Sequence, residues 1–135
     1  MSIEELPHTA DILVRVKAGS LEDLFAESVR ALMGFMYGDR REGTDARVIR
    51  VSSEDLTGLL VGFLSEVLFV SESERFVVAD ATVSITGTSL EARLTGEKFS
   101  QERHGGGVEV KGISYSGLSI IKTDEGCQAD ILFDV

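Results

Sequence analysis

The first patterned segment of the chain alternates β-branched aliphatic residues with other types. Between residues 12 and 17 this alternation predicts a half-buried strand, and a glycine–serine pair ends it. Ser20 has the residue type of a helix N-cap, and Asp23 occupies the capping-box position three residues later. The apolar residues that follow recur at helical spacing. We therefore expect an amphipathic helix that runs to about Tyr37 and ends at Gly38.

A second run with helical spacing starts near Ser52 or Ser53 and continues to Leu68. Its apolar residues match the i, i+3, i+4, i+7 pattern almost completely: Leu56, Leu59, Leu60, Phe63, Leu64, Val67 and Leu68. Gly58 and Gly62 lie on a neighbouring stripe of this helix, where each costs about 1 kcal/mol of helix propensity relative to Ala. The helix could simply tolerate these glycines, but we expect that they allow a close approach to a sheet or another helix.

From Arg75 onward the apolar period becomes two, which predicts a strand-rich second half. The expected strands, with one short strand before the second helix, are residues 48–51, 76–85, 89–95, 108–115, 118–123 and 128–133. Residues 105–107 are all glycine, but they precede an expected strand and so form a poor phosphate-binding loop. The pattern predicts an α+β fold, with two amphipathic helices packed on a mainly antiparallel β-sheet in a compact two-layer sandwich. We expect residues 1–135 to form a single domain.

Composition narrows the class of protein. The chain has 135 residues, of which 43% are hydrophobic and 27% charged, as in soluble globular proteins. Cys127 is the single cysteine, and no Cys/His spacing suggests zinc, which favours a reducing, cytoplasmic setting. We expect no signal peptide, because no basic region followed by an apolar run opens the chain. We also expect no membrane association, because no apolar stretch approaches the roughly 20 residues that span a bilayer.

The net charge of −10 argues against a nucleic-acid-binding surface. Such surfaces need clustered Lys and Arg to contact phosphates, whereas the densest basic stretch, Arg40–Arg41, lies between Asp39 and Glu42. We therefore expect no direct nucleic-acid binding. A cation, or a basic face on another protein, suits the charge better.

Acidic residues at the two ends of the chain are candidates for holding such a cation. Asp11 precedes the first strand, where aspartate also has turn and capping uses. The last strand runs almost to the end of the sequence, with Asp134 beside the terminal carboxylate of Val135, so we expect this end to be docked. If these three residues converge, their negative charges and oxygen-only ligands favour a hard ion such as Ca²⁺ or Mg²⁺. The residue pattern leaves that convergence open.

An ordered set of short motifs resembles the archease family. The motifs are His8–Asp11, Leu21–Phe25, Glu54–Leu56, Leu59–Leu60, Phe63–Glu66, Gly96–Glu97, His104, Lys111–Tyr115 and Ile131–Val135. The resemblance covers essentially the whole chain. It implies a compact α/β sandwich with one divalent-metal site, Ca²⁺ in the first place and Mg²⁺ or Mn²⁺ as alternatives. Carried over to this sequence, Asp11, Asp134 and the terminal carboxylate of Val135 are the implied ligands.

The resemblance also implies a partner, an RtcB-type RNA ligase that joins RNA ends in tRNA splicing. An archease is understood to promote guanylylation of the ligase's active-site histidine, which allows repeated turnover. The chain departs from the family at Ser116, because a histidine commonly follows the tyrosine of this segment. A role assigned to that histidine therefore does not carry over directly.

Three other residues each have two interpretations. His8 could orient Asp11 or a metal-bound water, or it could be a buried histidine that bonds the backbone. His104 stands beside three glycines, so we expect it in an exposed loop that could contact the partner. Lys111 interrupts an apolar strand, either as an outward-facing residue or as a contributor at the ligase active site.

The favoured interpretation is an accessory protein that activates the ligase and has no catalytic residues of its own. One alternative is a metal-assisted hydrolase of a small phosphate ester, in which the ion would activate water. Against it, the sequence offers no nucleophile–base pair and no second metal cluster. The other alternative, a general chaperone, would need a large exposed apolar patch, which the regular periodicity gives no reason to expect.

Overall fold

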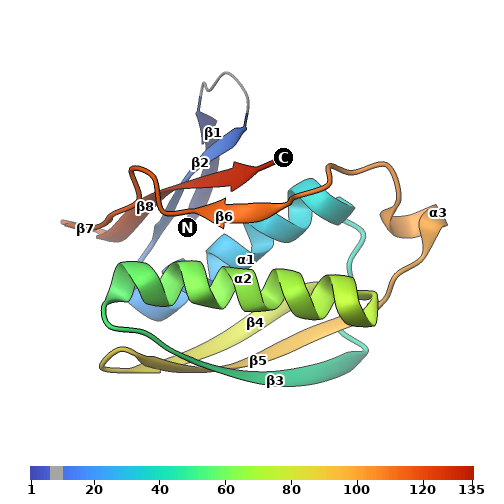
Figure 1. The fold of residues 1–135 in the computed structure, drawn as a ribbon, viewed down its shortest axis with the longest axis horizontal. Helices are drawn as coiled ribbons and strands as arrows, with labels where there is room; N and C mark the ends of the chain where they lie inside the picture. The colour runs from blue at the N-terminus through green and yellow to red at the C-terminus, as the bar shows by residue number, and fades with distance from the viewer. Residues whose placement is uncertain (7–10) are drawn as a thin grey trace.

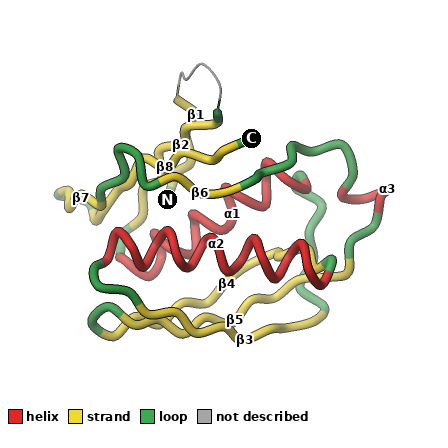
Figure 2. The backbone as a smooth tube through the Cα atoms, in the orientation of Figure 1, coloured by secondary structure: helices red, strands yellow, loops and turns green. Residues whose placement is uncertain are grey.

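The computed structural model describes residues 1–6 and 11–135, which are arranged in three layers (Figure 1). Two long helices, α1 (Leu21–Tyr37) and α2 (Leu56–Glu74), lie between two β-sheets. A short helix, α3 (Gln101–His104), stands apart at one end of the molecule. Figure 2 shows the same arrangement by type of secondary structure.

All strand pairings in the two sheets are antiparallel. The larger, five-stranded sheet has the order β1 (Ser2–Leu6), β2 (Ile12–Ala18), β8 (Gly126–Asp134) and β6 (Gly112–Ser114), and β7 (Ile120–Thr123) also pairs with β8. The smaller, three-stranded sheet has the order β3 (Asp45–Ser52), β5 (Ser89–Lys98) and β4 (Phe76–Thr86). The predicted α+β class, with helices on antiparallel sheets, is confirmed.

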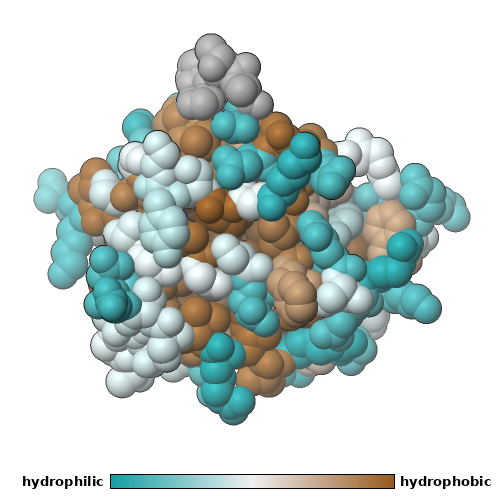
Figure 3. Space-filling view, viewed as in Figure 1, coloured by the Kyte–Doolittle hydropathy of each residue, from teal (hydrophilic) through white to brown (hydrophobic). Residues whose placement is uncertain are grey.

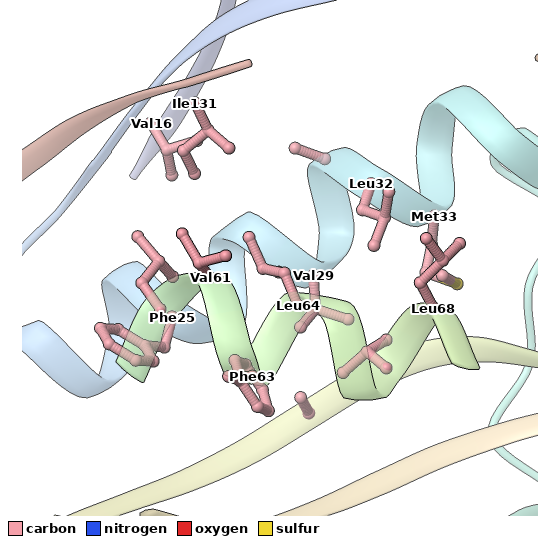
Figure 4. Close-up of a cluster of buried hydrophobic side chains, with 14 of the residues drawn as sticks. Val16, Phe25, Val29, Leu32, Met33, Val61, Phe63, Leu64, Leu68 and Ile131 are labelled. Atoms are coloured by element: carbon pink, nitrogen blue, oxygen red, sulfur yellow. The ribbon is translucent and has the colours of Figure 1, made fainter. Parts of the chain in front are cut away.

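The strands form two sheets, whereas the residue pattern predicted one. The reason is that the helices are apolar on more than one side. Buried residues of α2 extend beyond one stripe: at helical spacing, Val61 and Leu68 lie on the opposite side of the helix from Leu59, and all three are buried. A helix of this kind needs cover on both faces. Figure 4 shows the resulting core, in which α1 and α2 side chains lie beside Val16 and Ile131 of the larger sheet. The rings of Phe25 and Phe63 stack there with centroids 5.9 Å apart.

By length and composition, helix α2 is the one helix in the described part of the chain that is long and apolar enough to cross a bilayer. The expectation that no stretch approaches this length was therefore wrong. Its position between the sheets, with Phe63 and Leu64 fully buried, makes it a core helix of this fold.

The predicted start of α1 is confirmed, whereas that of α2 is wrong by a few residues. The Ser20 Oγ accepts a hydrogen bond from the Asp23 N–H at 3.1 Å, so Ser20 caps α1. Helix α2 begins later than Ser52 or Ser53, because β3 remains paired with β5 through Ser52. Asp55 caps α2 instead, and its Oδ1 accepts the N–H of the third helical residue at 2.7 Å.

The expected close approach to a sheet is confirmed at Gly62 but not at Gly58. A Cβ atom on Gly62 would lie 3.3 Å from Cγ1 of Val51, so the helix rests on β3 at this point. A Cβ atom on Gly58 would meet the Ser53 hydroxyl and the Asp55 carboxylate that caps the helix. Alanine at Gly62 would require a shift of a few tenths of an ångström against Val51, and alanine at Gly58 would displace the Ser53 and Asp55 side chains.

The two long helices run in the same direction (Figure 1). Their first residues, including Ser20 and Asp55, line one cavity, and Tyr37 and Glu72 near their ends line another. Neither helix has a basic residue in its last turn. The negative ends of two helix dipoles therefore meet at the end of the molecule that carries α3.

The predicted strand over residues 108–115 is shorter in the structure, where only β6 remains of it. The Val108 N–H donates to the carbonyl of Phe35 at the end of α1, at 2.9 Å, and so cannot join a sheet. Gly107 packs so closely on α1 that a Cβ atom there would overlap the carbonyl oxygen of Met36. Neither β1 nor α3 was predicted, since the residues of β1 are mostly exposed and show no apolar alternation.

Candidate metal centre

Strands β2 and β8 bring the two ends of the sequence together. Their ladder ends with Ile12 opposite Phe133, so Asp11 and Asp134 continue it side by side at one end of the larger sheet. The Val135 N–H donates to Oδ1 of Asp11 at 3.5 Å, a long hydrogen bond. The structure therefore places the three predicted ligand residues at one location.

The carboxylates of this location lie on the face of the sheet that points away from the helices. In β8 every second residue from Cys127 to Phe133 is buried, so Asp134 shares the outer face with Asp130. Asp130 is already neutralised by Arg15 of β2, which donates two hydrogen bonds at 2.8 and 3.0 Å. Among the ion pairs of residues 1–6 and 11–135, none involves Asp11 or Asp134. These two carboxylates keep their charge available for a cation.

Strand β6 supports the other side of Asp134. The Lys111 N–H donates to the backbone carbonyl of Asp134 at 2.7 Å. Gly112 pairs with Asp134, and a Cβ atom on Gly112 would lie 3.7 Å from its Oδ2. The glycine thus leaves one flank of the carboxylate uncovered. The Lys111 side chain is exposed, as the interpretation of an outward-facing residue requires.

This donor set can hold a hard divalent cation only with help from the chain end and from water. Within the described residues, no group of three or more His, Cys, Asp and Glu side chains could hold a metal ion. Asp11 and Asp134 are therefore too few side-chain ligands to hold such an ion by themselves. Ca²⁺ takes six to eight oxygen ligands, which leaves several positions for water. Val135 is 37% exposed, so water reaches this location.

Two other residues that the sequence singled out are His8 and Ser116. His8 lies outside the described residues, so its orienting role stays a prediction. Ser116 is exposed in the turn after β6, where its N–H donates to the Ser114 hydroxyl at 3.0 Å.

The expectation that His104 lies in an exposed loop was wrong. It ends α3, and its side chain has no exposed surface. The Ser100 N–H donates to its Nδ1 at 2.9 Å, and its Nε2 lies 3.2 Å from Oε2 of Glu97. Because Nδ1 accepts a hydrogen bond, this pattern assigns the proton to Nε2. The imidazole holds α3 against the end of β5 and is not at the surface, so it offers no contact to a partner.

Glu97 connects three parts of the chain and was not recognised as such in the sequence. Its carboxylate accepts from the Glu42 N–H at 2.7 Å and from Arg103 at 3.2 Å, in addition to His104. Burial raises the pKa of Glu97, but the hydrogen bonds from Glu42 and His104 and the charge of Arg103 outweigh it. The pKa is therefore below its ordinary value. No spacing rule reveals these contacts, because the partners come from α3 and from the distant segment at Glu42.

Comparisons with known proteins agree on one family. Residues 3–135 match the sequence profile described as the archease protein family (MTH1598/TM1083). The chain is 36% identical over 128 residues to a protein archease of Pyrococcus abyssi, which covers 91% of this chain and 90% of that protein. It is 30% identical over 138 residues to a protein archease of Methanosarcina acetivorans, covering 98% and 94% of the two chains.

Two solved structures have a similar fold. The solution structure of protein 1598 of Methanobacterium thermoautotrophicum superposes with a TM-score of 0.81 at 24% identity and covers 98% of both chains. The crystal structure of an archease from Thermotoga maritima, described as a possible chaperone, superposes with a TM-score of 0.68 at 17% identity. That match covers 98% of this chain and 96% of the other.

Proposed function

The chain belongs to the archease family, and from this premise we propose that it is an accessory protein of an RtcB-type tRNA-splicing RNA ligase. It activates the ligase by promoting guanylylation of the ligase's active-site histidine, which permits multiple turnover. The observation that carries this proposal is the meeting of Asp11, Asp134 and Val135 at one open end of the larger sheet. The protein itself is not the catalyst in this proposal.

In this proposal Asp11, Asp134 and the terminal carboxylate of Val135 hold a divalent cation, Ca²⁺ in the first place and Mg²⁺ or Mn²⁺ as alternatives. Two like unit charges 4 Å apart repel by about 4 kcal/mol at an effective dielectric near 20. A bound cation removes this repulsion. Water completes the coordination, and His8 orients Asp11 or a bound water.

The charge of the molecule supports a protein partner. A ligase that binds RNA presents basic surface, and a chain with a net charge of −10 is attracted to it. The metal centre is solvent-accessible and reachable by another protein, with the exposed Lys111 beside it. We propose no direct contact with RNA. The encounter takes place in the cytoplasm.

A chaperone role is the second candidate, because the Thermotoga maritima relative is described as a possible chaperone. Chaperones bind unfolded chains through extended apolar surface. On the face shown in Figure 3, apolar and hydrophilic groups are interspersed. The large exposed apolar residues are distributed over several elements, among them Phe69 of α2, Val48 of β3 and Ile121 of β7. Ligase activation therefore accounts for the acidic end of the sheet better than general chaperoning does.

The test compares the first turnover of a guanylylated ligase with its later turnovers, with and without this protein. An activator of guanylylation leaves the first ligation nearly unchanged and accelerates every later cycle, in which the histidine must be charged again with GTP. Equal stimulation of all cycles, accompanied by more soluble ligase, would instead indicate a chaperone. Hydrolysis of GTP or of a phosphate ester by the protein alone would indicate the metal-assisted hydrolase.

A further inference from the structure

A cavity of about 370 Å³ lies where α1 and α2 end, and the metal centre does not use it. The residues that line it include Tyr37, Phe99, Glu72 and Glu109. The rings of Tyr37 and Phe99 pack against each other with centroids 5.9 Å apart. The cavity therefore combines aromatic walls with acidic groups.

The glycine loop at residues 105–107 forms another side of this cavity. Gly106 has a φ of 85°, which side chains rarely adopt, and Gly107 lies directly on the last turn of α1. The Val108 N–H then bonds the carbonyl of Phe35 and fixes the loop to the helix. The cavity is bounded by backbone held in place on α1.

The two charged residues that line the cavity, Glu72 and Glu109, are both acidic. Glu72 and Glu109 are exposed, and within the described part of the chain neither forms an ion pair. The last turns of α1 and α2 contain no basic residue, but Arg75 is the C-cap of α2, and the Arg41 guanidinium donates to the carbonyl of Gly38, the C-cap of α1. The attraction for a cation in the cavity therefore comes from Glu72 and Glu109.

Phe99 already stacks with one guanidinium. The Cζ atom of Arg75 lies 5.0 Å from the centroid of the Phe99 ring, in an adjoining cavity that shares Tyr37, Glu72 and Phe99. This contact shows that a planar cation is accepted beside this wall. The larger cavity offers the same ring and a second carboxylate, Glu109, and Arg75 does not line it.

We propose that this cavity binds the guanidinium of an arginine side chain on a partner protein. A guanidinium is planar, so it can stack on an aromatic ring while its five N–H donors reach carboxylates on either side. An ammonium has no plane to stack and is more strongly hydrated, so lysine fits this cavity less well. The arginine provides a contact in addition to the metal centre.

The cavity and the metal centre are joined by one short segment. Glu109 lines the cavity, and Lys111, two residues later, bonds the backbone of Asp134. A partner whose basic surface meets the acidic end of the sheet can therefore place an arginine in the cavity at the same time. The identity of that partner as the ligase rests on the proposed function, whereas the preference for guanidinium does not.

In the binding test, Nα-acetyl-arginine amide is titrated into the ¹⁵N-labelled protein, and the backbone amide chemical shifts of the protein are measured. The matched probes are the citrulline derivative, which has the same shape without charge, and the lysine derivative. The arginine probe should give saturable shifts at residues 105–108, and E72Q/E109Q should weaken its binding about tenfold. E125Q, in the exposed turn between β7 and β8, removes a charge elsewhere and should leave binding unchanged. Equal binding of all three probes, or unchanged binding by E72Q/E109Q, would overturn the proposal.

A second arm separates this inference from the proposed function. In the ligation assay, E72Q/E109Q should raise the protein concentration needed for half-maximal stimulation about tenfold and leave the maximum unchanged. An unchanged half-maximal concentration would remove this cavity from the partner interface. If the wild-type protein does not stimulate the ligase at all, the proposed function fails while the arginine-binding result still stands.

Discussion

Oε2 of Glu97 lies 3.2 Å from the buried Nε2 of His104, and the same oxygen accepts from the Glu42 N–H and from Arg103. This contact fixes α3 at the end of β5. Residues 105–107 directly follow α3, so the position of the glycine loop depends on this carboxylate. Glu97 thereby supports the wall of the proposed arginine cavity without lining it.

The lowered pKa of Glu97 predicts a loss of stability in acid. A carboxyl group whose pKa is lower in the folded protein stabilises the fold at pH values above its ordinary pKa. That contribution is lost as the pH falls through the folded-state pKa. Glu97→Gln should lower the free energy of unfolding by about 1–3 kcal/mol near neutral pH and make it less dependent on pH below the ordinary carboxyl pKa. Chemical denaturation at a series of pH values measures both effects.

Glu91→Gln is the matched control for this prediction, because Glu91 pairs with Arg50 on the exposed face of the smaller sheet. It should change the stability by no more than about 0.5 kcal/mol. An identical pH dependence of Glu97→Gln and the wild-type protein would contradict the stabilising role of the Glu97 carboxylate.

The close approach of Gly107 to α1 predicts that alanine is poorly tolerated there. A Cβ atom on Gly107 would overlap the Met36 carbonyl, so the loop must move away from the helix. Gly107→Ala should lower the free energy of unfolding by about 1–3 kcal/mol. Gly19→Ala is the control, since a Cβ atom on Gly19 has no neighbour within 4 Å. Comparable melting temperatures of the two variants would show that the loop is not held against the helix.

Local features of the fold could be predicted from the sequence. The cap at Ser20 depends on residues within one helical turn, and the close packing at Gly62 follows from a glycine placed next to an apolar stripe. The alternation in the last strand correctly placed Asp130 and Asp134 on one face. Each of these features involves neighbours in the sequence, for which the spacing of residues carries the information.

Contacts between distant segments could not be predicted in the same way. His104 stands beside three glycines, which indicated an exposed loop, but Glu97 and Ser100 enclose its ring. The register of β2 against β8 decides whether Asp11 reaches Asp134, and no local pattern contains it. For the candidate site, the prediction that the two chain ends lie together came from the family resemblance and not from the spacing of residues.

Removal of either side-chain ligand tests the proposed metal centre. Asp11→Ala or Asp134→Ala should abolish Ca²⁺ binding measured by titration calorimetry, because each leaves a single side-chain carboxylate at the site. Asp124→Ala removes an exposed carboxylate from the turn between β7 and β8 and should bind Ca²⁺ as the wild-type protein does. The circular dichroism of all three variants should stay that of the folded protein. Wild-type affinity in both site variants would reject the assignment.

The proposed role of the Val135 carboxylate predicts a difference between tags at the two ends of the chain. An extension after Val135 turns its terminal carboxylate into a peptide carbonyl and removes one negative charge from the site. The same tag before Met1 leaves the three carboxylates in place. Saturation with Ca²⁺ at 100 times the dissociation constant should stabilise the N-terminally tagged protein by about 2.7 kcal/mol, and the C-terminally tagged protein by clearly less. Thermal unfolding of both proteins with Ca²⁺ and with a chelator measures this difference. The same increase in melting temperature for both would show that the terminal carboxylate is not a ligand, even if Asp11 and Asp134 are.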